Sequence, residues 1–185
     1  MALASGVIES IRNIKLAIFD VDGVLTDGSL TYGPNGEETK VFNALDGHGM
    51  KMLRESGVEL AIISGRKSQA LARRAKDLAV SHLFMGVDNK RDTFEALLKS
   101  LALVPAQVAG LGDDVIDLPF LMRCGFAAAV PSAPAYVRER VHYVTTAGGG
   151  QGAVREFCDL IMQTQGTWDA ALKKYLDQGP PHALD

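Results

Sequence analysis

This sequence contains few cysteines and has no excess of basic residues. The two cysteines, Cys124 and Cys158, fit no metal-ligand spacing and are weak evidence for a disulfide, so we expect both to be reduced core residues. Lysine and arginine number 19 against 22 aspartates and glutamates, which gives a net charge of −3. A chain without a basic surface is poorly suited to nucleic acid, so we expect no nucleic-acid partner.

Long hydrophobic runs are also missing. No run reaches the length of a membrane span, and residues 1–12 lack the charged start and apolar block of a signal peptide. We therefore expect a soluble cytoplasmic protein with no membrane partner. The 185 residues suffice for one domain with a core, which we assign to residues 1–178. Residues 179–185 lack the content to pack and are expected to form a flexible tail.

Short apolar runs typical of buried strands alternate with amphipathic segments typical of helices. The predicted strands cover residues 16–19, 59–63, 80–84, 108–111, 126–130 and 143–145, and the predicted helices cover residues 5–13, 47–56, 68–78, 90–101, 117–123, 134–140, 153–163 and 168–176. This alternation predicts an α/β fold, a doubly wound parallel sheet covered on both faces. Residues 29–42 depart from it, because turn residues at 33–36 separate two short β-type segments and predict a β-hairpin.

Two carboxylates, Asp20 and Asp22, follow the first predicted strand directly. They lie at the carboxyl edge of the predicted sheet, where ligands bind in open α/β folds. Residues two apart in an extended chain point the same way, so the two carboxylates would repel each other. A cation would relieve that repulsion, and magnesium prefers oxygen ligands.

Polar groups also follow other predicted strands or begin the next helix. They are Ser64 with Arg66, Lys90, and Asp113 with Asp114. Each alone could be an ordinary loop residue, since loops are polar anyway. Four consecutive βα units that bring such groups to one sheet edge favour a functional site.

Structural interpretations remain open for three of these side chains. Ser64 could cap the helix that follows it, and Asp117 could do the same for its own helix. Lys90 could be a solvated surface lysine. A cation in the first turn opposes the helix dipole, however, which favours a phosphate or a carboxylate opposite Lys90.

In this order, residues 20–27, residues 64–66, Lys90 and residues 112–117 resemble the four signature motifs of the haloacid dehalogenase superfamily. Residues 26–28 and the tract 149–156 extend the resemblance to the branch that contains 3-deoxy-D-manno-octulosonate 8-phosphate phosphatase. The resemblance implies a Rossmann-like sheet of the haloacid dehalogenase type. Neither gap between the motifs is large enough for a cap domain, so the hairpin at residues 29–42 is the expected insertion.

The resemblance also implies a phosphatase mechanism. Asp20 would be the nucleophile that forms an aspartyl phosphate, and Asp22 the general acid and base, although their spacing alone would allow the reverse. Mg²⁺ would be bound by Asp20, the main-chain carbonyl of Asp22, and Asp113. Asp114 and Asp117 would not bind the metal themselves but would orient the residues that do.

The remaining predicted contacts are to the substrate. Ser64 would donate its hydroxyl to a phosphate oxygen, and Lys90 would face the phosphate or a carboxylate. Arg66 would bind a substrate carboxylate or phosphate, because its planar guanidinium suits bidentate contact. The full predicted set for substrate binding is Thr26, Gly65, Arg66 and Arg74, although Arg73 and Arg74 together look like an exposed helix face.

We assign no ligand-binding role to His48 or to the glycines of residues 148–152. His48 is expected in a loop near the site and not as a ligand, since no second histidine lies at metal spacing. The glycines of residues 148–152 lack the lysine and the serine or threonine of a phosphate-binding loop. We expect this tract to be a flexible approach to the helix after it.

The implied substrate is a phosphorylated eight-carbon sugar acid, 3-deoxy-D-manno-octulosonate 8-phosphate, used in lipopolysaccharide precursor synthesis. A nine-carbon sugar-acid 9-phosphate and a catalytically inactive oligomeric homologue are the alternatives. A receiver-type signalling domain is disfavoured, because its phospho-acceptor follows the third strand. The resemblance also implies a homotetramer in which hairpins associate and a neighbouring subunit completes the site.

Overall fold

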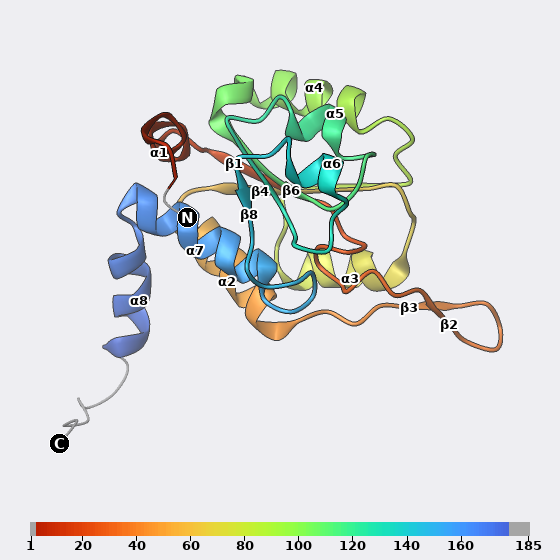
Figure 1. The fold of residues 1–185 in the computed structure, drawn as a ribbon. Helices are drawn as coiled ribbons and strands as arrows, with labels where there is room; N and C mark the ends of the chain where they lie inside the picture. The colour runs from red at the N-terminus through yellow and green to blue at the C-terminus, as the bar shows by residue number, and fades with distance from the viewer. Residues whose placement is uncertain (1–2, 178–185) are drawn as a thin grey trace.

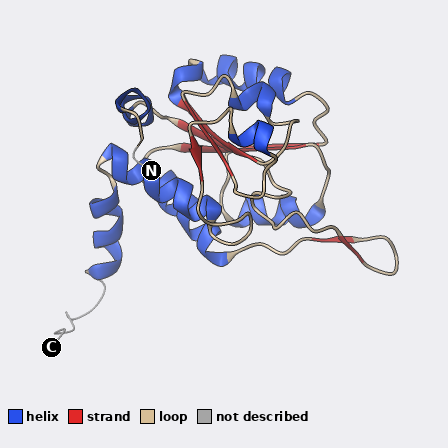
Figure 2. Ribbon diagram, in the orientation of Figure 1, coloured by secondary structure: helices blue, strands red, loops and turns tan. Residues whose placement is uncertain are grey.

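The computed structural model describes residues 3–177 and is built on a six-stranded parallel sheet of order β5-β4-β1-β6-β7-β8 (Figures 1 and 2). The strands are β1 (Leu16–Phe19), β4 (Glu59–Ser64), β5 (His82–Met85), β6 (Val108–Gly112), β7 (Phe126–Ala129) and β8 (Tyr143–Val144). From β1 the chain builds outward through β4 and β5, then crosses back to add β6 on the other side of β1. The predicted doubly wound α/β sheet is confirmed, with its switch point between β1 and β6.

Helices cover both faces of the sheet. The residues of α1 (Ser5–Arg12), α2 (Ala44–Glu55), α3 (Gln69–Asp77) and α7 (Ala153–Gln165) join one core cluster, and those of α4 (Lys90–Leu101) and α5 (Leu118–Leu121) join the other. Strand β1 contributes side chains to both clusters. Ala17 and Phe19 point to one face of the sheet, and Leu16 and Ile18 point to the other. Burial on both faces explains why the strand reads as a continuous apolar run.

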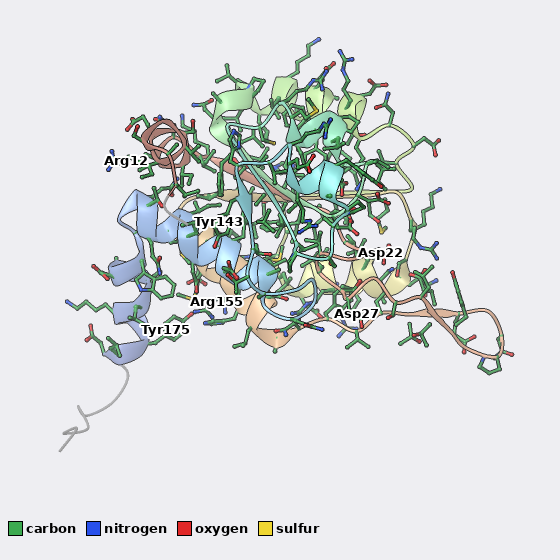
Figure 3. The ribbon with its side chains drawn as sticks, viewed as in Figure 1. Arg12, Asp22, Asp27, Tyr143, Arg155 and Tyr175 are labelled. Carbon is green, nitrogen blue, oxygen red and sulfur yellow. The ribbon has the colours of Figure 1, made fainter. Side chains whose placement is uncertain are left out.

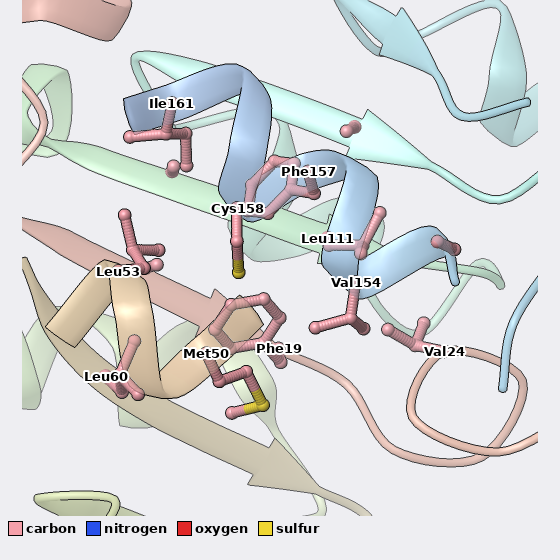
Figure 4. Packing of buried hydrophobic residues seen from close by; sticks show 14 of the residues in the cluster. Phe19, Val24, Met50, Leu53, Leu60, Leu111, Val154, Phe157, Cys158 and Ile161 are labelled. Atoms are coloured by element: carbon pink, nitrogen blue, oxygen red, sulfur yellow. The ribbon is translucent and has the colours of Figure 1, made fainter. Parts of the chain in front are cut away.

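The core beneath α7 contains aromatic rings packed among aliphatic side chains (Figure 4). The Phe157 ring meets Phe19 edge-on at 5.8 Å between centroids and stacks on Phe126 at 5.4 Å. Cys158 lies in the same cluster and Cys124 in the other, both buried and free, as predicted. Burial raises the pKa of both thiols, which keeps them unreactive.

The predicted hairpin is present but its paired part is short. Strands β2 (Thr31–Tyr32) and β3 (Glu38–Thr39) are antiparallel, with Thr31 opposite Thr39, and the hairpin extends away from the sheet (Figure 1). Pairing does not continue to residue 42 as predicted, because Lys40 turns inward to an ion pair with Asp22.

Helix α2 begins earlier than predicted. Asn43 caps it, since its side-chain oxygen accepts from the amides of Leu45 at 2.8 Å and Asp46 at 3.3 Å. His48 therefore lies inside a helix, and its prediction as a loop residue is wrong. Its ring packs against Tyr175 at 5.2 Å between centroids.

The remaining elements are short connections and one further helix, which lies away from the sheet beyond α7 (Figure 1). Short helix α6 (Ala135–Arg138) and a 3₁₀ turn at Pro105–Gln107 connect strands, and α8 (Trp168–Leu176) follows α7. No helix within residues 3–177 combines the length and the apolar character needed to cross a bilayer. The tail predicted at residues 179–185 lies outside the described residues.

Candidate active site

Carboxylates from two neighbouring strands converge at the switch point of the sheet. Asp20 follows β1, and its amide still donates to the Leu111 carbonyl of β6 at 3.0 Å. Oxygen atoms of Asp20, Asp113 and Asp117 all lie within 4.8 Å of one another. The sheet order thus brings together Asp20 and Asp113, which are far apart in the sequence.

The loop after β1 is shaped around this cluster. Gly23 has a φ of +92°, and a Cβ there would lie 2.2 Å from Asp113 Oδ2, so only glycine fits. The buried Thr26 hydroxyl accepts from the amides of Gly23 at 3.4 Å and Gly28 at 3.3 Å. Thr26 thereby closes the loop on itself, and its contact with substrate stays a prediction.

Lys90 begins α4 and is buried against two of the carboxylates. Its Nζ donates to Asp20, and to Asp117 Oδ1 at 2.5 Å. Burial alone would lower the pKa of Lys90, but the charges of Asp20 and Asp117 outweigh it and raise that pKa. Lys90 is a buried cation, so the surface-lysine interpretation is excluded.

Asp117 organises the backbone of the same loop. It is fully buried, and its Oδ2 accepts from the amides of Asp113 at 3.0 Å and Asp114 at 3.3 Å. Its side chain makes no capping bond to α5, so the helix-cap interpretation is wrong. Asp114 instead binds the amide of Val115 at 2.7 Å and lies outside the three-carboxylate cluster.

Negative charge exceeds positive charge inside the cluster. Burial, followed by the charge of Asp117, raises the pKa of Asp20 to about 7, although Lys90 opposes the shift. Burial, followed by the charges of Asp20, Asp117 and Asp114, raises the pKa of Asp113 to about 8. A divalent cation would remove this imbalance, and an all-oxygen donor set suits magnesium.

Ser64 lies at the end of β4, beside β1, and is buried. Its Oγ accepts from the amide of Arg66 at 3.2 Å. Helix α3 begins five residues later and is capped by Ser68, whose Oγ accepts from the amide of Leu71 at 3.4 Å. The interpretation of Ser64 as a helix cap is therefore wrong, while its contact with phosphate stays a prediction.

A network of charged groups joins the hairpin to the site. Arg66 Nε and Nη2 donate to Glu38 Oε2 at 3.2 and 2.5 Å, and Nη2 also reaches the Tyr32 hydroxyl at 2.8 Å. Lys40 Nζ pairs with Asp22 and with Glu38 Oε1, the latter at 2.9 Å. Figure 3 shows Asp22 at the side of the molecule from which the hairpin extends.

Sequence reasoning missed Glu38 and Lys40. The sequence holds no sufficient signal for them, because a hairpin lysine is normally solvated and only the fold brings Lys40 to Asp22. The hydrogen bonds from Arg66, and then the contact with Lys40, lower the pKa of Glu38 to about 2. Burial would lower the pKa of Lys40, but its hydrogen bond to Asp22 and its ion pair with Glu38 outweigh that effect and raise the pKa. Both groups are therefore charged.

The glycine tract is packed and not a flexible approach, so that prediction is wrong. Gly150 donates its amide to the Val24 carbonyl at 2.9 Å. A Cβ on Gly149 would lie 1.8 Å from the Gly23 carbonyl oxygen. The tract thus packs against the main chain of the loop after β1.

Two predicted substrate contacts lie at the margin of this arrangement. Arg74 is half-buried and not part of an exposed face, since its Nη2 donates to the Asn43 carbonyl at 3.0 Å and its guanidinium lies over the Phe42 ring. Gly65 is exposed directly after Ser64. The roles of Arg74 and Gly65 in substrate binding stay predictions.

Individual known proteins match this chain over most of its length, although no family model matches the sequence. The 3-deoxy-D-manno-octulosonate 8-phosphate phosphatase KdsC of Escherichia coli (strain K12) is 45% identical over 169 residues, which cover 91% of this chain and 90% of that protein. The crystal structure of a "probable YrbI family phosphatase" from Pseudomonas syringae pv. phaseolica 1448A is 50% identical with a TM-score of 0.92, covering 96% of this chain and 100% of the other.

A third relative has ligands in its crystal structure. It is the 3-deoxy-D-manno-octulosonate 8-phosphate phosphatase from Moraxella catarrhalis, in complex with a magnesium ion, a phosphate ion and KDO. It is 41% identical to this chain with a TM-score of 0.89, and the match covers 91% of this chain and 97% of the other.

Proposed function

The chain belongs to the 3-deoxy-D-manno-octulosonate 8-phosphate phosphatase family of the haloacid dehalogenase superfamily, and from this premise we propose that it hydrolyses 3-deoxy-D-manno-octulosonate 8-phosphate to the free sugar acid and phosphate. The observation that carries the proposal is the convergence of Asp20, Asp113 and Lys90 at the switch point of the sheet. The proposed nucleophile, a proposed metal ligand and a buried cation thus lie within one small volume.

The reaction proceeds in two steps on Asp20 and Asp22. A carboxylate oxygen of Asp20 attacks phosphorus, the bond from phosphorus to the sugar oxygen breaks, and Asp22 gives a proton to that leaving oxygen. Asp22 then removes a proton from a water molecule, which attacks the aspartyl phosphate and releases Asp20 and phosphate. Splitting one inert hydrolysis into two steps lowers the barrier of each.

Mg²⁺ is the proposed cofactor. Asp20, Asp113 and the main-chain carbonyl of Asp22 would hold it, and the raised pKa values of Asp20 and Asp113 support a cation between them. When bound, the ion neutralises charge on the transferring phosphate. Asp117 orients the backbone of Asp113, and Asp114 assists that turn.

Substrate binding is assigned to side chains around this centre. Ser64 and Lys90 bind phosphate oxygens, and Arg66 binds the carboxylate of the sugar acid through its guanidinium. Thr26, Gly65 and Arg74 complete the proposed set. Arg66 supports this assignment best, because its side chain is 40% exposed and already binds a carboxylate, that of Glu38.

The assembly we propose is a homotetramer of single-domain subunits spanning residues 1–178. The sequence between the motifs forms no cap, so a neighbouring subunit would close the site and exclude water. Exposed apolar side chains on and beside the hairpin, Leu30, Tyr32 and Val41, support association there.

Phosphate release tests the function. Purified protein is given the eight-carbon 8-phosphate and a nine-carbon sugar-acid 9-phosphate, each with Mg²⁺ and with chelator. We expect the higher kcat/KM on the eight-carbon substrate, and loss of activity with chelator. A higher kcat/KM on the nine-carbon substrate would reassign the substrate, and no turnover of either would indicate an inactive homologue.

A further inference from the structure

We propose that Lys40 is a positioning residue, which holds one oxygen of Asp22 so that the other faces the leaving group. The proposal rests on the function proposed above, in which Asp22 is the general acid. It adds a hairpin residue to the machinery of the site.

The side chain of Lys40 is shielded from solvent, although both of its neighbours in the chain are exposed. Its side chain is only 1% exposed, whereas Val41 beside it is 79% exposed. A lysine is seldom fully buried, and burying its ammonium is unfavourable unless charged partners compensate. Its partners are Asp22 on the loop after β1 and Glu38 on the hairpin, 2.9 Å away. This burial therefore depends on the contact with Asp22.

The contact makes the two oxygens of Asp22 different. Oδ1 accepts from Lys40 Nζ. Oδ2 lies 3.8 Å from Arg66 Nε, beyond hydrogen-bonding distance, and no group within residues 3–177 donates to it. Oδ2 is consequently the oxygen available for proton transfer, while Oδ1 is the oxygen that fixes the carboxylate in place.

Lys40 is itself held from the other side. Glu38 Oε1 forms an ion pair with Lys40 Nζ, and Glu38 Oε2 accepts hydrogen bonds from Arg66, so Glu38 lies between the two cations. Arg66 follows β4, and Asp22 follows β1. The chain of contacts Asp22, Lys40, Glu38 and Arg66 therefore fixes the hairpin to the ends of two central strands.

Positioning and direct substrate contact predict different kinetics. If Lys40 bound the phosphate directly, its loss would affect every phosphate ester in the same way. If it positions the general acid, its loss matters only where the leaving oxygen needs a proton. The sugar alcohol needs one because its alkoxide is strongly basic, whereas 4-nitrophenolate leaves without one.

The test compares Lys40→Met with wild type on the eight-carbon sugar-acid phosphate and on 4-nitrophenyl phosphate, both with saturating Mg²⁺. General acid catalysis contributes about 10²-fold or more, so we expect kcat on the sugar phosphate to fall by about 10-fold to 10²-fold. On 4-nitrophenyl phosphate we expect a change below about 3-fold. Lys51→Met, at an exposed lysine of α2, is the matched control and should change neither rate.

Two further variants show whether Lys40 acts through Asp22. Adding Lys40→Met to Asp22→Asn should cause no further loss on the sugar phosphate, because residues that act as one unit are not additive. Lys40→Arg keeps the charge and should recover part of the lost kcat. It also serves as the test variant if Lys40→Met does not fold, with the same substrate ratio as the readout.

Equal losses on the two substrates, or a full additive loss in the double variant, would overturn the role of Lys40 while leaving the proposed function intact. A wild-type protein that hydrolyses neither ester would instead overturn the proposed function itself.

Discussion

Asp20 and Asp117 both bind one buried lysine, Lys90, at the edge of the sheet, and Asp113 belongs to the same carboxylate cluster. Removing one partner from a buried ion pair leaves an uncompensated charge and typically costs about 3–5 kcal/mol. Lys90 therefore supports the fold as well as the proposed phosphate contact. The uncompensated charge that remains has consequences for pH and for metal binding.

Stability of the metal-free protein should fall as the pH rises from about 5 to about 8. The pKa values of Asp20 and Asp113 are raised in the folded state to about 7 and about 8, from 3.8. Within this window the folded state binds more protons than the unfolded state, so stability decreases with pH. Mg²⁺ binds the deprotonated carboxylates and should raise the melting temperature more at the alkaline end.

Thermal melts with chelator and with Mg²⁺ across this pH range measure both effects. Asp113→Asn should flatten the pH dependence of the metal-free melting temperature. A melting temperature that rises with pH without metal, and that Mg²⁺ does not change, would contradict the charge imbalance.

Single residues differ in how far the sequence predicts them. The convergence of Asp20 and Asp113 was predictable because strand ends meet at one sheet edge. Lys40 and Glu38 were not, since a hairpin lysine is normally solvated and only the fold shows Asp22 beside it. The caps were misassigned for a similar reason: Ser64 and Asp117 bind loop amides, and only the three-dimensional path of each loop reveals which amides those are.

Among the elements, the glycine tract before α7 acts on the loop after β1 through close packing. Gly149 touches the Gly23 carbonyl, and Gly150 donates its amide to Val24. Asp46 of α2 joins the same unit, because its carboxylate accepts from the amides of Gly152 at 3.3 Å and Arg155 at 2.8 Å. The start of α7 and the loop after β1 are thus one packed unit.

Gly149→Ala should impair both stability and catalysis. A Cβ at this position would lie 1.8 Å from the Gly23 carbonyl oxygen, so backbone must move. Overpacking of this kind typically costs about 1–3 kcal/mol. We expect a lower melting temperature and a lower kcat for phosphate release.

Gly148→Ala is the matched control for this substitution. A Cβ there would meet only the Gln151 side chain, whose oxygen lies 3.2 Å away, and this side chain can rotate away. A Gly149→Ala protein as stable and as active as Gly148→Ala would contradict the role of the tract.

Helices and strands were mostly predictable from hydrophobic periodicity, and their starts less so. Helix α2 was predicted from residue 47 because the cap at Asn43 was not recognised. The hairpin was predicted from turn residues, but its pairing ends where Lys40 turns to Asp22, a tertiary contact that periodicity does not encode.

For the whole molecule, the hairpin is the one insertion that extends from the sheet within the described residues (Figure 1). Its exposed apolar side chains lie beside the network of Lys40, Glu38 and Arg66, because Tyr32 is paired with Glu38 across the two strands and Val41 follows Lys40. Association of hairpins would therefore act directly on groups that contact Asp22.

Light scattering should give about four times the mass of one chain at working concentration. Val41→Lys puts a charge on the exposed hairpin surface and should lower that mass, because like charges meet where hairpins associate. Val104→Lys, at an exposed valine beside the 3₁₀ turn, should leave the mass unchanged. A wild-type monomer would contradict the proposed assembly.

The central claim, that Asp20 is the nucleophile of a phosphatase, is tested most directly by phosphate release from the eight-carbon substrate by Asp20→Asn. The asparagine has nearly the same shape but lacks the attacking carboxylate, so we predict loss of activity, with Asp27→Asn, at an exposed aspartate of the same loop, as the control. Circular dichroism confirms that each variant is folded. A folded Asp20→Asn protein that turns over substrate at the wild-type rate would contradict the account.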